Sequence, residues 1–327
     1  MLTPGNEVAT SLAPPLSAAV RCAICGSADE QVVDVHVSGG HSIRDVQCLR
    51  CGHVYLSPRE SAEAYDAYYR QQGFSKNCNN VSGEDDPSAL ARSAEKKTQR
   101  IYRFLEPELR PGLRVLEIGC GYGNLLARIR ESVGGDVTGI EPDPIGPVVA
   151  RSVFHLEIAS QTLEQFLVGW NGKPFDLILM HHVLEHFLDI DVVGDALEML
   201  LAPGGRVYLG LPNVTAMTFP KRFFFRFPHV SNFTPYSFLL FLWRHDLKIV
   251  RLDNLGRPLS AIVASRIDAA PMVAAFPLVT ASLSPGRVRR SIALCDIHHT
   301  IRLFIRDHRG KLLPAPLKRA VKTLIRK

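Results

Sequence analysis

Four cysteines in two closely spaced pairs are the first residues whose chemistry the sequence reveals. Cys22 and Cys25 form one C-x-x-C pair, Cys48 and Cys51 form a second, and a glycine follows each pair. Each pair brings two thiolates onto one turn, and two pairs complete the tetrahedral four-sulfur set that Zn²⁺ prefers. Structural zinc sites leave no open coordination position, so we expect this metal to fold the segment and to take no part in chemistry.

An acidic residue and three glycines form a second group, in the stretch VLEIGCGYGN. Glu117 precedes Gly119, Gly121 and Gly123, with one residue between each and the next. Glycine permits close approach of a ligand to the backbone, and a glycine turn between strand and helix binds nucleotide-like ligands. Turns that bind pyrophosphate prefer the spacing G-x-G-x-x-G. The spacing here differs, and an acid before the glycines suits the cationic groups of S-adenosylmethionine.

This E-x-G-x-G-x-G stretch resembles the first motif of the class I S-adenosylmethionine-dependent methyltransferases, and the resemblance covers residues 93–268. It implies that Glu117 and the three glycines hold S-adenosylmethionine. Glu141 follows at the tip of the next expected strand, where an acid hydrogen-bonds both ribose hydroxyls. In the resembled family the next loop lies against the adenine, which makes Gln161 and Thr162 the candidates for that contact.

Three histidines and a glutamate follow the fourth expected strand, in the stretch PFDLILMHHVLEHF. The carboxyl ends of strands in a doubly wound sheet line the ligand crevice, so these side chains should lie beside the cofactor. We assign His181 to cofactor binding, Glu185 to substrate binding, and His182 and His186 to the catalytic candidates. The stretch also resembles the corresponding motif of many small-molecule methyltransferases.

A further histidine, His229, lies in the aromatic-rich insert FRFPHVSNF. In the resembled family this insert covers the acceptor pocket. An oxygen acceptor, or a carbon next to a carbonyl, must lose a proton, and histidine is a natural base near neutral pH. We predict His229 as the base, with His186 as a pocket wall or second base. For each of these histidines the alternative is a structural role in holding a loop.

Tyr68 and Tyr69 are predicted to close the acceptor pocket from the N-terminal side. With Tyr65 they share one helical face, which packs the helix onto the body in the alternative interpretation. The order of zinc ribbon, tyrosine-bearing helix and methyltransferase domain also resembles bacterial sugar C-methyltransferases, which act on nucleotide-linked keto-deoxysugars and use a histidine base. Those proteins commonly carry a further α/β domain, whereas only 59 residues follow Asp268 here.

The elements that must position these residues follow an α/β pattern. We predict a doubly wound, seven-stranded, Rossmann-like methyltransferase sheet with a small N-terminal zinc ribbon. A helix is expected from Ser93 to about Leu109, and another directly after the fourth strand, beginning at residues 181–186. The expected strands of the sheet lie near residues 115–118, 136–140, 155–158, 176–180, 205–211, 246–256 and 259–267, the last two as an antiparallel pair. The ribbon is expected to pair residues 31–37 with residues 42–47 around a Gly39-Gly40 turn.

Composition and these patterns divide the chain into five segments. We predict a disordered leader over 1–19, the zinc ribbon over 20–58, a helical segment and linker over 59–92, the methyltransferase domain over 93–268, and a basic tail over 269–327. No apolar run reaches the roughly 18 to 20 residues that span a bilayer, so we expect a cytoplasmic protein. Residues 286–327 hold twelve Lys or Arg and two Asp or Glu. This tail is either a solvated helix face or a peripheral contact with an anionic membrane.

The leading hypothesis is an enzyme that methylates a small molecule or a sugar, where the sugar is linked to a nucleotide or belongs to a surface glycan. An RNA methyltransferase is the alternative, but the only basic residues between Cys22 and Cys51 besides histidines are Arg44 and Arg50, and no Pro-Pro-Tyr motif follows the fourth strand. A third hypothesis is a binding module that has lost catalysis. The intact Glu117, glycines and Glu141 argue against it. The pattern carries no information on the oligomeric state.

Overall fold

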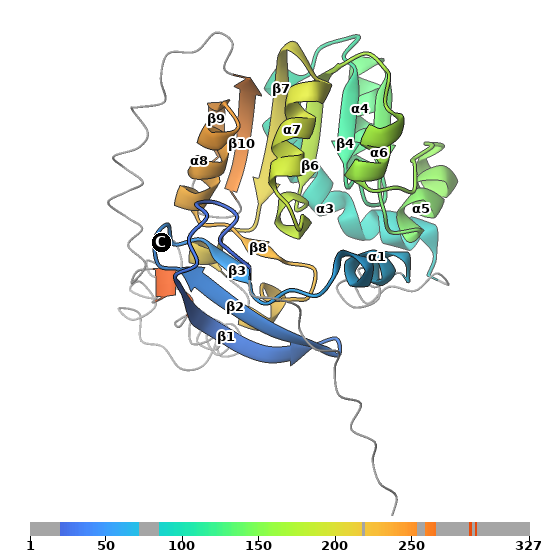
Figure 1. Cartoon of the computed structure of the whole chain (residues 1–327). Coiled ribbons are helices and arrows are strands. Elements are labelled where there is room, and N and C mark those ends of the chain that lie inside the picture. The colour runs from blue at the N-terminus through green and yellow to red at the C-terminus, as the bar shows by residue number, and fades with distance from the viewer. Residues whose placement is uncertain are drawn as a thin grey trace, which may run out of the picture.

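The computed structural model describes residues 20–71, 85–217, 220–253 and 259–265, together with residues 288, 289 and 292. These residues form two sheets, a larger one with six strands and a smaller one with four (Figure 1). The predicted leader, most of the predicted linker and the predicted C-terminal helix lie outside the described residues.

The larger sheet has the strand order β5-β4-β6-β7-β10-β9. The first four of these strands are parallel, and β10 runs antiparallel to both β7 and β9, which confirms the predicted antiparallel pair. The strands are β4 (Val115–Ile118), β5 (Val137–Ile140), β6 (Phe175–His181), β7 (Leu201–Leu211), β9 (Leu247–Asp253) and β10 (Leu259–Ser265).

The strand predicted near residues 155–158 contributes a single parallel bridge between Ile140 and Ala159. Glu141 N donates to Ala159 O and Ala159 N donates to Gly139 O, each at 3.0 Å. The chain then leaves the edge of the sheet after these two hydrogen bonds. The described residues therefore hold six strands in this sheet, and the seventh position is reduced to one bridge.

Helices cover both faces of the larger sheet (Figure 1). Strand residues alternate between the faces: Val115 and Leu177 pack against α3 and α4, whereas Leu116 and Ile178 share a core with α6, α7 and α8. This alternation is what burying both faces of a sheet requires. The helices are α3 (Pro87–Leu105), α4 (Asn124–Val133), α5 (Ile145–Phe154), α6 (Leu163–Gly169), α7 (Asp191–Leu200) and α8 (Pro235–Arg244).

Two helix starts differ from the prediction. α3 begins at Pro87, six residues before the predicted start, because the Asp86 carboxylate accepts hydrogen bonds from Ser88 N and Ala89 N and so caps the helix there. The helix predicted at residues 181–186 is only the short 3-10 turn η2 (Leu184–His186). The backbone of His182 is in the left-handed region with φ of 58°, which interrupts a right-handed helix at that point.

The smaller sheet has the order β1-β2-β3-β8, which we call the ribbon sheet. Its strands are β1 (Glu30–Ser38), β2 (His41–Cys48), β3 (Val54–Leu56) and β8 (Ser231–Asn232). The predicted hairpin of the ribbon is confirmed, with Ser38 opposite His41 across the Gly39-Gly40 turn. The fourth strand, β8, comes from the aromatic-rich insert, far away in the sequence.

A continuous core joins the two sheets. Cys48 and Tyr55 of the ribbon belong to the same buried cluster as Phe233 and Phe238 at the start of α8. The remaining short elements are α1 (Ala62–Arg70) and the 3-10 turns η1 (Glu106–Glu108), η3 (Val214–Ala216) and η4 (Lys221–Phe223). Among the helices of the described residues, none is long and apolar enough to cross a membrane.

Candidate functional site

A cavity of about 530 Å³ opens at the carboxyl ends of β4, β5 and β6. Its walls come from the glycine turn, from the stretch that follows β6, and from α1 and α3. The carboxyl edge of a parallel sheet is where folds of this kind bind ligands. Most of the residues predicted for cofactor binding line this cavity, namely Glu117, Gly119, Gly121, Glu141, Gln161, Thr162 and His181.

The structural requirement for glycine differs among the three positions of the turn. All three have positive φ, between 54° and 78°. A Cβ on Gly119 would collide with Val183, and one on Gly123 would press on Ile158 Cδ1 at 3.0 Å, so both glycines serve packing. A Cβ on Gly121 would meet no atom within 4 Å, because that position faces the cavity. Gly121 is thus the glycine of the turn that leaves room for a ligand.

Glu117 is the third of the four residues of β4, and it forms part of the cavity wall. The residue is 5% exposed, and Oε2 has no hydrogen-bond partner in the structure. Burial raises the pKa of this carboxyl to about 8, an effect that the charge of Lys97 partly offsets. A buried carboxylate oxygen without a partner is costly unless a donor arrives, which favours a cationic ligand group at this position.

Glu141 already holds the turn together. Its two carboxylate oxygens accept hydrogen bonds from Gly121 N at 2.8 Å and Asp143 N at 2.9 Å. Burial raises its pKa to about 7, although these two bonds pull the value down. Each oxygen retains further acceptor capacity, so the carboxylate can serve the turn and a ligand hydroxyl together.

Gln161 and Thr162 line the cavity at the start of α6. The Thr162 hydroxyl accepts a hydrogen bond from Gln165 N and the Gln165 side chain accepts one from Thr162 N, which is a capping box. Thr162 therefore has a structural task at the helix start in addition to its place on the wall.

His181 lines the cavity but is anchored to the sheet. Its Nδ1 lies 2.9 Å from the Tyr208 hydroxyl, and the two rings stack at a centroid distance of 5.9 Å. Burial lowers its pKa well below the usual range, and the neighbouring His182 lowers it further. The sheet therefore holds one ring nitrogen of His181, whereas Nε2 is buried without a partner and is free to meet a ligand.

Glu185 is surrounded by the other two histidines of the stretch. Its Oε1 lies 3.5 Å from His182 Nδ1 and 3.9 Å from His186 Nε2, and the residue is 1% exposed. Burial raises the pKa of Glu185 to about 8 and lowers those of His182 and His186 to about 3 and 4. His182 has the most exposed side chain of the three, at 40%. Both histidines line the cavity, whereas Glu185 lies behind them.

His229 packs behind His186 and is not part of the cavity wall. It is 4% exposed. Its ring meets that of His186 edge-on at 5.0 Å, and its Nε2 lies 3.1 Å from an Arg226 guanidinium nitrogen. The sequence pattern assigned His229 to the base, but the structure interposes His186 between it and the cavity.

The tyrosines of α1 divide between packing and the cavity. Tyr69 lines the cavity, whereas Tyr68 is buried edge-on against Phe227 and Tyr69. Tyr65, which the prediction gave only a packing role, also lines the cavity while stacking on Phe227 at 4.4 Å. The tyrosine helix therefore both packs and closes the site.

Lys97 on α3 is a cavity residue that the sequence pattern did not identify. It is the one Lys or Arg among the described residues that line the cavity. The same lining holds five acidic residues, Asp66, Glu117, Glu141, Asp143 and Glu164. Desolvation lowers its pKa, and the charge of Glu117 opposes that effect most strongly. The helix that carries Lys97 holds many charged residues, and nothing in the sequence distinguishes Lys97 from the neighbouring lysine on that helix, which does not line the cavity.

The four predicted zinc ligands converge at one point. Cys22 and Cys51 Sγ lie 3.6 Å apart, Cys25 and Cys48 Sγ lie 3.5 Å apart, and all four sulfurs fall within 4.8 Å of one another. Zinc–sulfur bonds of about 2.3 Å in a tetrahedron separate the sulfurs by about 3.8 Å, so the arrangement fits Zn²⁺. The glycines that follow each pair, Gly26 and Gly52, have φ of 71° and 73°, as the tight bends require.

The part of the sequence that forms most of the larger sheet matches one family of known proteins. Residues 90–252 match the family model described as "Methyltransferase domain". Over 157 residues the chain is 31% identical to the ubiquinone biosynthesis O-methyltransferase of Xylella fastidiosa strain M23, covering 46% of this chain and 63% of that protein's length. The same enzyme of strain 9a5c is 31% identical over 167 residues, covering 48% of this chain and 67% of the relative.

Solved structures of similar shape include two methyltransferases. The magnesium protoporphyrin IX methyltransferase of Synechocystis PCC 6803 with bound SAM has a TM-score of 0.43 and 17% identity, covering 62% of this chain and 96% of that one. The 1,6-didemethyltoxoflavin-N1-methyltransferase of Burkholderia thailandensis has a TM-score of 0.45 and 18% identity, covering 70% and 98%.

Proposed function

Because this chain belongs to the S-adenosylmethionine-dependent methyltransferases, we propose that the cavity beside its glycine turn binds the methyl donor and a small-molecule acceptor together. The observation that carries this proposal is the Glu117 carboxylate, buried at the end of β4 with Oε2 lacking a partner. The ammonium group of the donor's methionine end supplies the hydrogen-bond donor that this oxygen lacks.

The other cavity residues suit the remaining parts of the donor. Gly121 leaves backbone surface open to it, and Glu141 can accept hydrogen bonds from the ribose hydroxyls. Gln161 and Thr162 are the candidates for the adenine contact. Lys97, the one cation on the described wall, is placed to pair with the methionine carboxylate.

For the chemical step we propose His182 as the general base. Its side chain is 40% exposed, against 12% for that of His186, and its Nδ1 faces Glu185 Oε1 at 3.5 Å. Its left-handed backbone, with φ of 58°, is a strained conformation of the kind that gathers at functional sites. Nδ1 directed at a carboxylate leaves Nε2 as the nitrogen that takes the acceptor proton, and an ionised Glu185 stabilises the imidazolium that results.

S-adenosylmethionine, when bound, supplies a methyl group on a cationic sulfur that leaves as a neutral thioether. Much of the catalysis is then the positioning of the acceptor. Tyr65 and Tyr69 form the cavity wall on the side of α1, where the acceptor would bind. His186 completes this wall, with His229 packed behind it.

The acceptor class is a sugar or another small molecule that loses a proton during the reaction. Relatives named as O-methyltransferases support a hydroxyl acceptor. The order of ribbon, tyrosine helix and methyltransferase domain supports a keto-sugar, whose carbon next to the carbonyl is the alternative site of attack. We further propose that Cys22, Cys25, Cys48 and Cys51 bind one structural Zn²⁺.

Calorimetric titration with S-adenosylmethionine tests the donor site. We expect Glu117→Gln and Glu141→Ala each to weaken binding by about 5- to 150-fold, which is the effect of losing a buried hydrogen-bond partner worth about 1 to 3 kcal/mol. Glu157→Gln is the matched control, because Glu157 is an exposed carboxylate paired with Arg151 on the surface.

Turnover of S-adenosylmethionine with panels of keto-sugar nucleotides and hydroxylated aromatic compounds then tests the acceptor class. Wild-type protein that fails to bind S-adenosylmethionine would contradict the donor site. Methylation of RNA in preference to both panels would contradict the small-molecule acceptor.

A further inference from the structure

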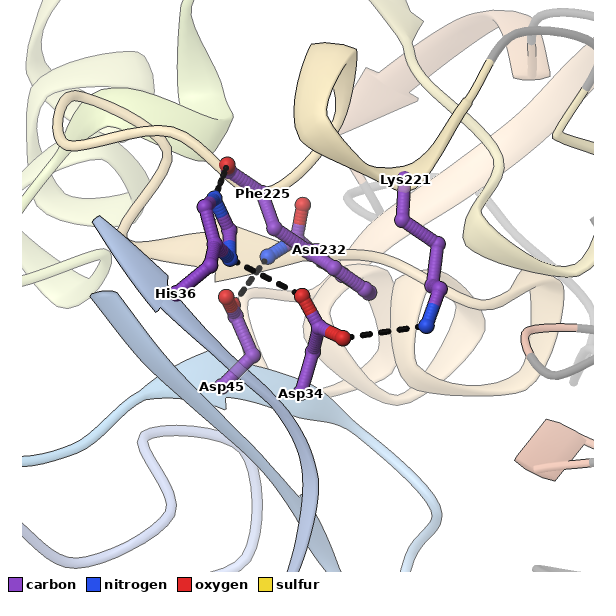
Figure 2. A network of polar contacts seen from close by, with 6 residues as sticks. All are labelled: Asp34, His36, Asp45, Lys221, Phe225 and Asn232. Carbon is purple, nitrogen blue, oxygen red and sulfur yellow. Dashed lines mark hydrogen bonds and ion pairs between the residues drawn. The ribbon is translucent and has the colours of Figure 1, made fainter. Parts of the chain in front are cut away.

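The loop that carries His229 is held by the ribbon sheet near its start. This loop, residues 220–230, precedes β8. Lys221 Nζ lies 3.0 Å from Asp34 Oδ1 on β1, and the second oxygen of Asp34 lies 2.9 Å from His36 Nδ1. The other ring nitrogen of His36 lies 3.0 Å from the carbonyl oxygen of Phe225 (Figure 2). Two neighbouring side chains of β1 therefore reach a loop almost 190 residues further along the chain.

A second contact anchors the chain just after the loop. Asn232 Nδ2 on β8 donates a hydrogen bond to Asp45 Oδ1 on β2 at 3.0 Å (Figure 2). Asp45 is fully buried, and burial, followed by the charge of Asp34, raises its pKa well above the usual range. A buried hydrogen bond of this kind is costly to break, because both groups are then stranded away from water.

Between these two anchors the loop contacts His186, which is part of the cavity wall. His186 Nδ1 donates to the carbonyl oxygen of Pro228 at 2.8 Å, and the rings of His186 and His229 meet edge-on. A shift of the loop would therefore move the hydrogen-bond acceptor that fixes the His186 ring.

We propose that Asp34, His36 and Asp45 are positioning residues for the acceptor end of the cavity and act through the loop on His186. The acceptor end of the cavity is assigned by the proposed function, and the inference rests on that assignment. The contacts between the ribbon, the loop and His186 do not depend on it. It assigns the ribbon a task beyond its own folding: it sets the orientation of a cavity histidine.

The donor end of the cavity should not respond to the same residues. Glu117 lies on β4 and the glycine turn follows that strand. Glu141 accepts one hydrogen bond from Gly121 N of this turn and one from Asp143 N, just after β5. Neither of the two hydrogen bonds that Glu141 accepts involves the ribbon sheet. Substitutions in the ribbon are therefore expected to separate the two ends of the site.

The test follows the Nδ1 proton of His186 by NMR in full-length, zinc-loaded protein. A proton held by the Pro228 carbonyl gives a slowly exchanging downfield signal, which the His186→Asn variant identifies. We expect the signal to shift or vanish in His36→Ala and in Asp45→Ala. It should persist in Asp45→Asn, whose amide oxygen still accepts from Asn232. Val35→Ala is the matched control, since Val35 adjoins His36 on β1 and is 62% exposed.

Zinc content and the S-adenosylmethionine Kd are measured on the same samples, and we expect both to stay within about twofold of wild type. An unchanged His186 signal in both His36→Ala and Asp45→Ala would overturn the inference. Should Asp45→Ala fail to fold, His36→Ala, which removes a partly exposed side chain, decides alone. Failure of wild-type protein to bind S-adenosylmethionine contradicts the proposed function and leaves the NMR result to be judged separately.

Discussion

At the scale of single residues, the cavity contains many acids and one described cation, Lys97. We predict that Lys97→Met weakens S-adenosylmethionine binding by about 10-fold, because a charge-assisted hydrogen bond to the methionine carboxylate is lost. Binding of decarboxylated S-adenosylmethionine should change little, since that ligand lacks the group. Calorimetry with both ligands checks this.

Lys96→Met is the control for that measurement, because Lys96 is exposed on the same helix and does not line the cavity. Equal weakening of both ligands by Lys97→Met would mean that the lysine acts on the fold of the cavity and not on the carboxylate.

The pair of Glu185 and His182 leads to a pH dependence. Burial raises the pKa of Glu185 to about 8, so its carboxyl is protonated at pH 7 in the ligand-free protein. Only the ionised carboxylate stabilises a protonated His182, so we predict that kcat rises as pH increases through about 8. The effect is lost below that pH. Measured at saturating S-adenosylmethionine, this inflection should vanish in Glu185→Gln.

The low pKa of His182, about 3, gives the second half of that prediction. A base with this pKa is unprotonated throughout pH 5 to 9, so no inflection is expected near 6.5, where an exposed histidine titrates. An inflection near 6.5 that survives in His182→Gln would assign the base to another residue.

At the scale of elements, we expect the ribbon to depend on the proposed Zn²⁺. Its two C-x-x-C turns bring four sulfurs within 4.8 Å of one another, and a structural zinc ion adds its binding energy to folding. We predict that Cys51→Ser, or chelation of the metal, exposes the ribbon to cleavage by trypsin at Arg44 and Arg50. S-adenosylmethionine binding should persist, because the donor residues lie on the other sheet.

Limited proteolysis followed by mass spectrometry locates the cuts, and a zinc-sensitive dye counts the released metal. Cys120→Ser is the control for metal release and proteolysis, since Cys120 is a buried cysteine within the glycine turn and outside the ribbon. Proteolysis at the same rate with and without metal would contradict a folding role for the site.

Elements with local signals were predictable, and those that depend on distant pairing were not. The hairpin of β1 and β2 follows from alternation around two glycines, and the glycine turn follows from its spacing. The pairing of β3 with β8 joins Val54 to Asn232, and a two-residue strand has no period from which to predict it. His229 lies two residues before β8, and the sequence had no signal that would show it to lie outside the cavity lining.

At the scale of the whole molecule, four buried carboxyls of the described residues have raised pKa values that make stability depend on pH, namely Asp45, Glu117, Glu141 and Glu185. Burial raises the pKa of Glu117 and Glu185 to about 8 and that of Glu141 to about 7, from ordinary values of 4.5. A raised pKa means that the folded state holds the proton more tightly, so this stabilisation is fully present below about pH 4.5 and is lost as pH rises from there through the folded pKa values of about 7 to 8.

We therefore predict that the free energy of unfolding falls between about pH 4.5 and pH 8, by at most about 1.4 kcal/mol per pH unit for each carboxyl. Urea titrations at intervals of pH measure this slope, which should be shallower in Glu117→Gln. Saturating S-adenosylmethionine should restore stability at pH 8, because its ammonium then pairs with Glu117. A free energy that stays level over this range would contradict the prediction.

The path of the chain has a consequence for how such a molecule can be recombined. Along the described residues the chain first forms the ribbon, then builds most of the larger sheet, returns to the ribbon sheet as β8, and continues into α8, β9 and β10 (Figure 1). A ribbon grafted from another protein would therefore meet the wrong partner strand unless residues 220–234 travelled with it. Chimeras that exchange both segments should fold, whereas those that exchange one should not. Inheritance of acceptor preference then follows a pair of segments that are distant in the sequence and adjacent in space.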